Sequence, residues 1–128
     1  MAEEEVLNRL EHNLLSMQVD DVEPMFVLYA DTVRDVEGAT LDLVAQALAR
    51  LVELGLSRCY VVDKEWTRCE RLTFEDLKRR FHGLSEKERR EYPLYVPEYY
   101  FEITDRGRTE EAKEVYAAYY RDVDNTDA

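Results

Sequence analysis

The sequence contains few of the residues on which several functional classes depend. Only two of its 128 residues are cysteine, which is too few for a secreted disulfide scaffold. Its four glycines stand singly, so no glycine-rich loop is present that would hold a phosphate group. His12 and His82 belong to no HxxxH or HExxH motif, and no CxxC motif occurs. We therefore expect no metal site, no cofactor and no enzymatic activity.

A hydrophobic run long enough to span a membrane is also missing, as is a signal-peptide pattern at the N-terminus. These absences predict a cytoplasmic protein in which Cys59 and Cys69 are reduced, buried or half-buried thiols. A metal or redox pair formed by the two cysteines is the alternative. The length and the hydrophobic content of 45% predict a single folded domain over residues 1–128, with a frayed tail at about 122–128.

Acidic residues outnumber basic ones by 29 to 17, which gives a formal net charge of -12. Such a charge repels nucleic acids, anionic membranes and most acidic ligands. The charge is uneven: residues 1–58 carry 4 basic and 12 acidic side chains, residues 59–91 carry 9 and 8, and residues 92–128 carry 4 and 9. A nucleic-acid partner would therefore need the middle segment, which holds more than half of the cations.

Helical periodicity dominates the first half of the chain. It predicts an amphipathic helix over residues 3–17, a second helix over 24–36 with Pro24 in its first turn, and a central, mostly buried helix over 40–56. Thr40 is the predicted N-cap of the central helix, and Gly55 is predicted to end it in a left-handed turn. Leu43 is assigned to the apolar face of this helix.

The second half mixes strand and helix signals. Residues 57–63 and 99–104 are rich in β-branched and aromatic residues and predict two strands, with helix and loop between them. Thr73 and Asp76 have the spacing of a capping box. A final helix is predicted over residues 110–121, capped by Thr104 or Asp105, with Val115 and Tyr116 on its inner face.

Two short motifs, LARLVELGL at 48–56 and YYFEITDRGR at 99–108, resemble those of the winged helix-turn-helix superfamily. The resemblance implies an α+β, winged-helix-like fold in which the central helix is the recognition helix and residues 59–104 form the wing. A helical insertion at about 66–92 and extra N- and C-terminal helices depart from the pattern. The resemblance also implies a homodimer formed through the terminal helices.

The polar stripe of the central helix is unsuited to DNA, because Asp42, Gln46, Arg50 and Glu53 carry a net charge of minus one. A DNA-binding transcriptional regulator would instead use cations of the insertion together with the one arginine of the stripe. The phosphate-contact candidates of this alternative are Arg50, Lys78, Arg79, Arg80, Lys87, Arg89 and Arg90. The same cations are also typical of a solvated helical surface with internal ion pairs.

Tyrosines gather near the second strand and in the final helix. Tyr95, Tyr99 and Tyr120 are the candidates for a protein interface, and core packing is the alternative for each of them. The acidity and the tyrosines together favour a non-enzymatic protein-protein interaction module. A DNA-binding regulator is the second hypothesis, and a small acidic neutraliser of a basic protein, of the immunity or antitoxin kind, is the third.

Overall fold

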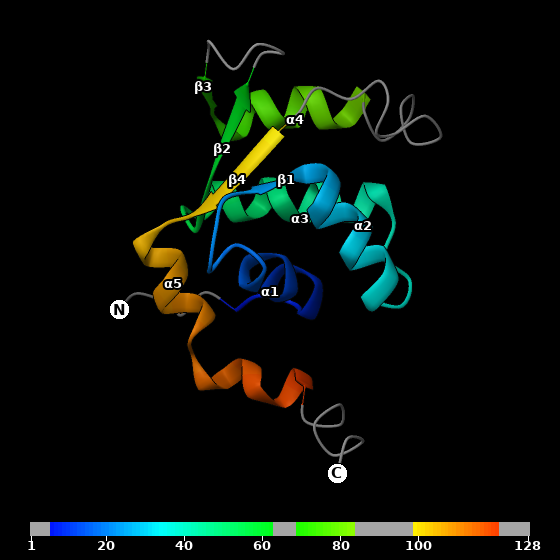
Figure 1. The fold of residues 1–128 in the computed structure, drawn as a ribbon, viewed down its shortest axis with the longest axis vertical. Helices are drawn as coiled ribbons and strands as arrows, with labels where there is room; N and C mark the ends of the chain where they lie inside the picture. The colour runs from blue at the N-terminus through cyan, green and yellow to red at the C-terminus, as the bar shows by residue number, and fades with distance from the viewer. Residues whose placement is uncertain (1–5, 63–68, 84–98, 121–128) are drawn as a thin grey trace.

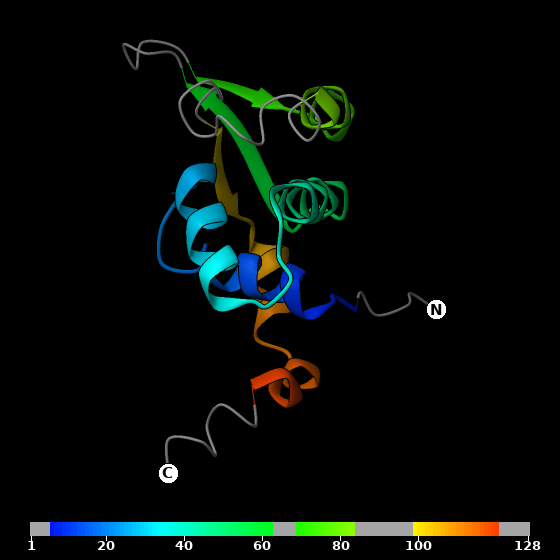
Figure 2. The same cartoon turned by 90° about the vertical axis from the view of Figure 1, so that its right-hand side faces the viewer.

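The computed structural model describes residues 6–62, 69–83 and 99–120 and has mixed α and β structure, which confirms the predicted α+β class. Four antiparallel strands form one sheet in the order β1-β4-β2-β3. Figures 1 and 2 show α2 on one side of the strands and the α3 and α4 helices on the other. Among the described residues, no helix is long and apolar enough to cross a membrane.

The first helix is shorter than predicted. α1 spans Arg9–Ser16 because Asn8 caps it: the Asn8 side chain accepts a hydrogen bond from the Glu11 amide, and the Glu11 carboxylate accepts one from the Asn8 amide. Residues 6–8 are therefore outside the helix, and the predicted start at residue 3 lies outside the described residues.

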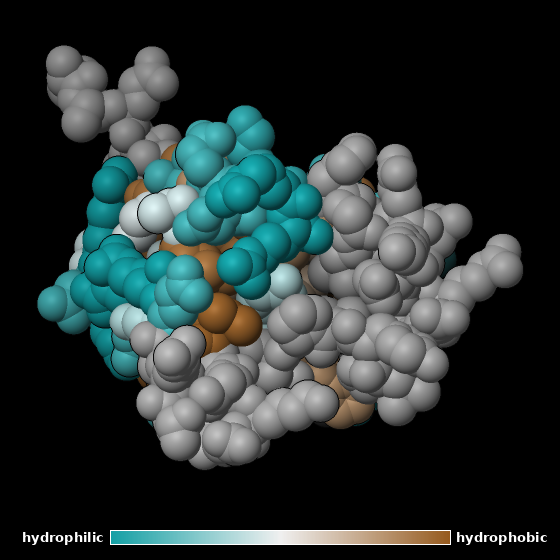
Figure 3. Space-filling model, turned by 90° about the horizontal axis from the view of Figure 1, so that it is seen from above, coloured by the Kyte–Doolittle hydropathy of each residue, from teal (hydrophilic) through white to brown (hydrophobic). Residues whose placement is uncertain are grey.

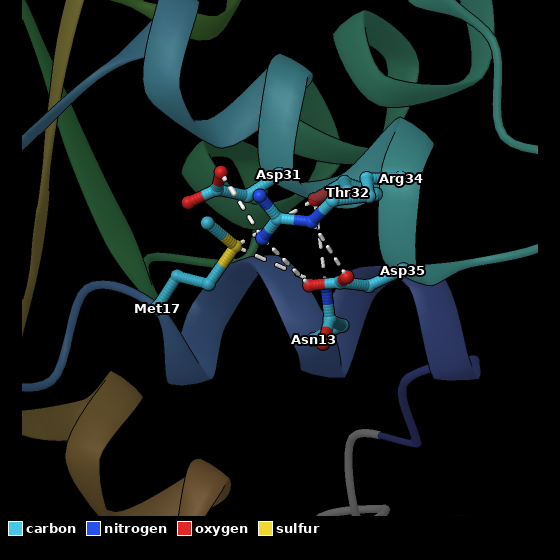
Figure 4. A network of polar contacts seen from close by, with 6 residues as sticks. All are labelled: Asn13, Met17, Asp31, Thr32, Arg34 and Asp35. Carbon is cyan, nitrogen blue, oxygen red and sulfur yellow. Dashed lines mark hydrogen bonds and ion pairs between the residues drawn. The ribbon is translucent and has the colours of Figure 1, made fainter.

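The second helix, α2 (Met25–Asp35), packs against α1 through a small polar contact. Asn13 of α1 donates to the Thr32 hydroxyl at 3.4 Å, and that hydroxyl lies 3.6 Å from the Met17 sulfur (Figure 4). Pro24 is the residue before α2 rather than part of its first turn. With Glu23 it forms the two-residue strand β1.

The central helix α3 (Leu41–Glu53) agrees closely with the prediction. The Thr40 side chain accepts a hydrogen bond from the Leu43 amide at 3.2 Å, and Gly55 ends the helix region with a φ of 77°. Its buried side chains, among them Leu48 and Leu51, belong to the hydrophobic core. Leu43 is an exception, since 44% of it is exposed.

The predicted strands β2 (Ser57–Val62) and β4 (Tyr99–Ile103) pair as antiparallel neighbours. The prediction missed β3 (Cys69–Leu72), which pairs with the other edge of β2. Its four residues, Cys-Glu-Arg-Leu, are too few and too polar to show a strand period, so pairing with β2 defines it. The segment 66–92 is therefore not purely helical, and the hairpin partner of β2 along the chain is β3.

The next helix, α4 (Phe74–Gly83), begins with the predicted capping box. The Thr73 hydroxyl accepts from the Asp76 amide at 3.2 Å, and the Asp76 carboxylate accepts from the Thr73 amide at 2.9 Å. The hydrogen bonds that the Thr73 amide and hydroxyl donate to the carboxylate, aided by the nearby charge of Arg79, hold the pKa of Asp76 below its usual range.

The final helix is not continuous as predicted. Thr104 caps α5 (Asp105–Glu111), which ends at Ala112, and a separate 3-10 helix, η2, spans Glu114–Tyr120. Tyr116 is buried, but Val115 is 52% exposed rather than on the inner face. The break allows η2 to turn Tyr116 toward the chain's N-terminal segment, where the Leu7 amide donates to its hydroxyl at 3.0 Å.

The two motifs that resemble winged-helix proteins meet in space. The Thr104 amide donates to the Leu56 carbonyl at 3.0 Å, and the Thr104 hydroxyl donates to the Gly55 carbonyl at 2.7 Å. A Cβ atom at Gly107 would overlap the Leu56 carbonyl oxygen and would lie 2.7 Å from a carbon of Ile103. Only glycine fits at position 107, because the backbone of Leu56, the residue before β2, lies directly beside it.

Candidate functional site

The α3 and α4 helices lie side by side (Figure 2) and enclose a groove of about 510 Å³, which we call the α3–α4 groove. Its lining combines apolar residues from both helices with the polar stripe of α3. The apolar part consists of Ala45, Ala49, Phe74, Leu77 and Phe81, and the polar part of Asp42, Gln46, Arg50, Glu53 and Lys78.

The apolar face of α4 explains why this helix lies against α3. Leu77 is fully buried and Phe81 nearly so, and the Phe81 ring meets the Tyr99 ring edge-on with centroids 5.3 Å apart. On α3 the facing positions Ala45 and Ala49 have small side chains, which let the two helices approach closely. One wall of the groove is thus formed by the segment that interrupts the predicted wing.

The cations of the groove are engaged with carboxylates outside it. Arg50 reaches the buried carboxylate of Glu11 at 2.5 Å, and Lys78 lies 3.9 Å from Glu75 and above the ring of Phe74. Asp42 and Glu53 form no ion pair within the described part of the chain. They therefore leave the groove with a negative potential.

One oxygen of this groove has an unusual environment. Asp42 Oδ1 is buried, and no residue of the described segments donates a hydrogen bond to it. A carboxylate oxygen removed from water without a donor is costly, and most buried polar atoms in folded proteins have a partner. The position of Asp42 in the first turn of α3 lowers that cost, because the helix dipole favours an anion there, but supplies no hydrogen bond to this atom.

The cations proposed to contact phosphate do not form a continuous basic surface. Arg50 and Lys78 share the groove with Asp42 and Glu53, while Arg79 is paired with Asp76 at 2.5 Å. Burial raises the pKa of the Tyr99 phenol, and the hydrogen bond and charge of Arg80 oppose that rise. The remaining three candidates, Lys87, Arg89 and Arg90, lie outside the described residues.

The candidate interface tyrosines have three different outcomes. Tyr99 is 4% exposed and packs in the core, because alternate residues of β4 face inward, so it offers little surface to a partner. Tyr95 lies outside the described residues. The Tyr120 hydroxyl lies 2.8 Å from His12 Nδ1, and Arg9 lies over the Tyr120 ring.

Tyr120 belongs to a larger set of contacts that joins the N-terminal segment to η2, which we call the terminal cluster. The Tyr116 hydroxyl accepts a hydrogen bond from the Leu7 amide and donates one to the Glu110 carboxylate. The Tyr119 hydroxyl donates to the Leu7 carbonyl. The His12 ring stacks on Tyr116 with centroids 4.3 Å apart, and its Nε2 lies 2.9 Å from the Glu111 carbonyl.

The terminal cluster also bears on the predicted homodimer. Leu14 is fully buried within its own chain, so the apolar stripe of α1 is already partly covered. Val6 and Val115, at 58% and 52% exposure, remain on the surface near this cluster. The homodimer therefore stays a prediction, with less of α1 available to form it than the sequence indicated.

The two cysteines are separated in the sheet register. Cys59 pairs with Leu72 across the β2–β3 ladder, whereas Cys69 pairs with Val62. Three residues of strand separate the two pairs, roughly 10 Å, which exceeds the Cα separation of a disulfide. Cys59 is a free, buried thiol. Burial raises the pKa of this thiol, and the charge of Arg80 acts in the opposite direction.

Within the described segments, no group of three or more His, Cys, Asp or Glu residues is placed to hold a metal ion.

Comparison of the chain with protein-family models, with curated proteins and with solved structures finds no match. The candidate site therefore depends on geometry alone. Sequence reasoning identified the polar stripe of α3 but missed the α4 side chains that complete the groove. A signal was available: Ala45 and Ala49 adjoin the stripe, and such small residues often mark a face against which another helix packs.

Proposed function

We propose that this protein is a non-enzymatic interaction module, built on an acidic winged-helix-like fold, that binds a basic segment of a partner protein in the α3–α4 groove. The observation that carries the proposal is Asp42, whose Oδ1 atom is buried without a donor at the edge of an apolar floor. A lysine or arginine of a partner would supply the missing hydrogen bonds and pair with the charge.

The groove also suggests the form of the partner segment. Its floor is made by two neighbouring helices, and such floors accept an amphipathic helix whose apolar side chains recur every three to four residues. Asp42 and Glu53 lie near opposite ends of α3, so cations on the partner helix would be spaced along the groove. An immunity-like or antitoxin-like neutraliser of a basic protein is a special case of this proposal.

A DNA-binding regulator remains the alternative. The polar stripe that a regulator would present to bases lies beside α4. Two of the candidate phosphate-contact cations are paired with carboxylates, Arg50 with Glu11 and Arg79 with Asp76. Figure 3 shows the described part of the upper face as mainly hydrophilic with a small hydrophobic area. We therefore rank this alternative second.

The proposal can be tested by site-specific photocrosslinking in cells. A photoreactive amino acid placed at Gln46, which is exposed on the rim of the groove, should capture a discrete protein, whereas the same group at exposed Asp35 on α2 should not. The identified partner is then titrated with purified wild-type protein and two charge-matched variants. Asp42→Asn should weaken binding about tenfold, and Asp20→Asn, at an exposed site, less than about twofold.

Duplex DNA of random sequence serves as the competing ligand in an anisotropy titration at low salt. We expect no binding. Binding that falls steeply with salt, together with no crosslinked protein at Gln46, would replace the interaction module with a DNA regulator. Equal losses in Asp42→Asn and Asp20→Asn would show that only the overall charge matters and would remove the groove from the proposal.

A further inference from the structure

A second hollow lies on the other side of Phe74, where the end of α3, the β2–β3 hairpin and the start of α5 meet. It has a volume of about 620 Å³, within the range of small-molecule sites. Its lining holds three arginines, from three different elements, in a protein whose net charge is -12. We call it the arginine pocket, and its charged residues are Arg58, Arg71, Arg106 and Asp105.

The balance of charge in this pocket is positive. Three guanidinium groups face one lining carboxylate, and the carboxylate of Glu102 lies 3.5 Å from Arg58 just outside the lining. Among the described residues, counting both carboxylates still leaves an excess of one formal positive charge. Arg71 is exposed and forms no ion pair with any residue of the described segments. The pocket is thus a local exception to the acidic field of the molecule.

The hydroxyl groups that line the pocket are already used as donors. Ser57 donates to Gln18, Thr73 to Asp76 and Thr104 to the Gly55 carbonyl. The exposed guanidinium group of Arg71 is therefore the main side-chain donor that this lining offers a ligand. Arginine presents several N–H groups in one plane and binds phosphate by paired hydrogen bonds.

Part of the remaining wall is apolar. Val52, Leu72 and Phe74 line the same hollow as the arginines, so a bound anion would have an uncharged body to place against them. Inorganic phosphate alone would leave this surface uncovered, whereas an ester with a flat or apolar body would bury it.

We propose that the arginine pocket binds a small phosphate monoester whose organic part packs against Phe74. The site is independent of the α3–α4 groove, although Phe74 borders both hollows. A duplex DNA backbone fits less well, because Asp105 and Glu102 adjoin the pocket and successive DNA phosphates would pass close to them.

The test is a calorimetric titration of the full chain with adenosine monophosphate as the probe, at low ionic strength. Adenosine, inorganic phosphate and a random DNA duplex form the comparison series. We expect saturable binding of the monophosphate, weaker binding of inorganic phosphate and none of adenosine. Arg71→Ala should weaken monophosphate binding at least about tenfold.

The matched control is Arg79→Ala, which removes the same charge from an exposed residue of α4 outside the pocket. It should change affinity less than about twofold. Equal effects of the two variants would overturn the proposal in favour of a general field, and failure of both phosphate probes to bind would overturn it outright. Tighter binding of duplex DNA, lost in both variants, would assign the arginines to a nucleic-acid surface instead. Circular dichroism of each variant confirms that the chain is folded.

Discussion

The terminal cluster and the face that carries the two hollows treat their polar groups in opposite ways. In the terminal cluster and the adjoining capping box of α1, buried Glu11, His12 and Glu110 each contact a side-chain or backbone group of the same chain. On the other face, Asp42 Oδ1 is buried without a described donor, and Arg71 has no ionic partner in the described segments. A buried polar residue thus stabilises the fold in the first region, whereas in the second the buried oxygen of Asp42 is retained at some cost to stability, as expected of a binding surface.

The largest expected effect is at the junction of the two regions. Replacing Gly107 by alanine forces a Cβ onto the Leu56 carbonyl, and neither backbone can move without breaking the Thr104 hydrogen bonds. We expect Gly107→Ala to lower the free energy of unfolding by about 3 kcal/mol, measured by urea denaturation.

The same substitution at Gly38 is the control for Gly107→Ala. Gly38 has a φ of 82° but open space around its Cα, so the loss should be only about 1 kcal/mol. Comparable losses in the two variants would show that the junction is not sterically tight. They would also weaken the case that the two motifs depend on each other.

The contribution of the terminal cluster to stability can be measured by removing the hydroxyl group of Tyr116. Tyr116→Phe deprives the Leu7 amide of its acceptor and leaves the buried Glu110 carboxylate with Lys113 in place of two partners, which should cost about 2 kcal/mol in urea denaturation. Tyr60→Phe is the control, since the Tyr60 hydroxyl contacts Glu102 only at 3.4 Å and at partial exposure. A neutral result at Tyr116 would mean that the terminal cluster contributes little to stability.

The same tyrosine predicts a dependence on pH. Burial, and then the hydrogen bond to Glu110, raise the pKa of Tyr116 well above the value of about 10 in an unfolded chain. The folded state therefore holds this proton longer, and the stabilisation is complete below about pH 10 and declines as the pH rises further. Unfolding midpoints of wild type and Tyr116→Phe should converge above pH 10; a constant difference would contradict this.

A smaller loss is expected where the terminal cluster meets α3. Glu11→Gln removes the charge that Arg50 reaches at 2.5 Å and weakens the acceptor of the α1 capping box. Because the Arg50 side chain is 42% exposed, we expect about 1.5 kcal/mol rather than the cost of a fully buried pair. Glu75→Gln, in an exposed pair with Lys78, should stay within about 0.5 kcal/mol.

The smallest change in stability should be at the α3–α4 groove, and whether it is a gain or a loss tests the contrast between the two regions. Asp42→Asn removes a charge from a buried atom without a described donor, while losing part of the favourable helix-dipole term. We expect stability to be unchanged within about 0.5 kcal/mol or slightly increased. A loss above 1 kcal/mol would show that Asp42 has a structural role and would remove the main support for the groove as a binding site.

Local chemistry made much of the fold predictable. Thr40, Thr73 and Thr104 cap helices as their spacing indicated, and Gly55 adopts the left-handed turn, because each signal depends on neighbouring residues alone. The β3 strand and the break between α5 and η2 were missed, since β3 is defined by its partner β2 and the break by the contact between Leu7 and Tyr116.

The candidate sites were harder to predict for the same reason. The stripe of α3 was visible in the sequence, and Ala45 and Ala49 indicate that a helix packs beside it, but nothing local shows that this helix is α4. The arginine pocket joins Arg58, Arg71 and Arg106, which are far apart in the chain and brought together only by the β2–β3 hairpin and the Thr104 junction. Counting charges segment by segment does not show that residues from different segments meet in one pocket.

The strand order has a consequence for how the protein is made. β4 lies between β1 and β2, so a strand from late in the chain occupies an interior position of the sheet. During synthesis, the earlier segments can form helices and the β2–β3 hairpin, but Phe101 is absent from the core until most of the chain has been translated. Folding should therefore be completed late, through contacts between residues distant in sequence, and truncation before Ile103 should leave a chain that cannot close its core.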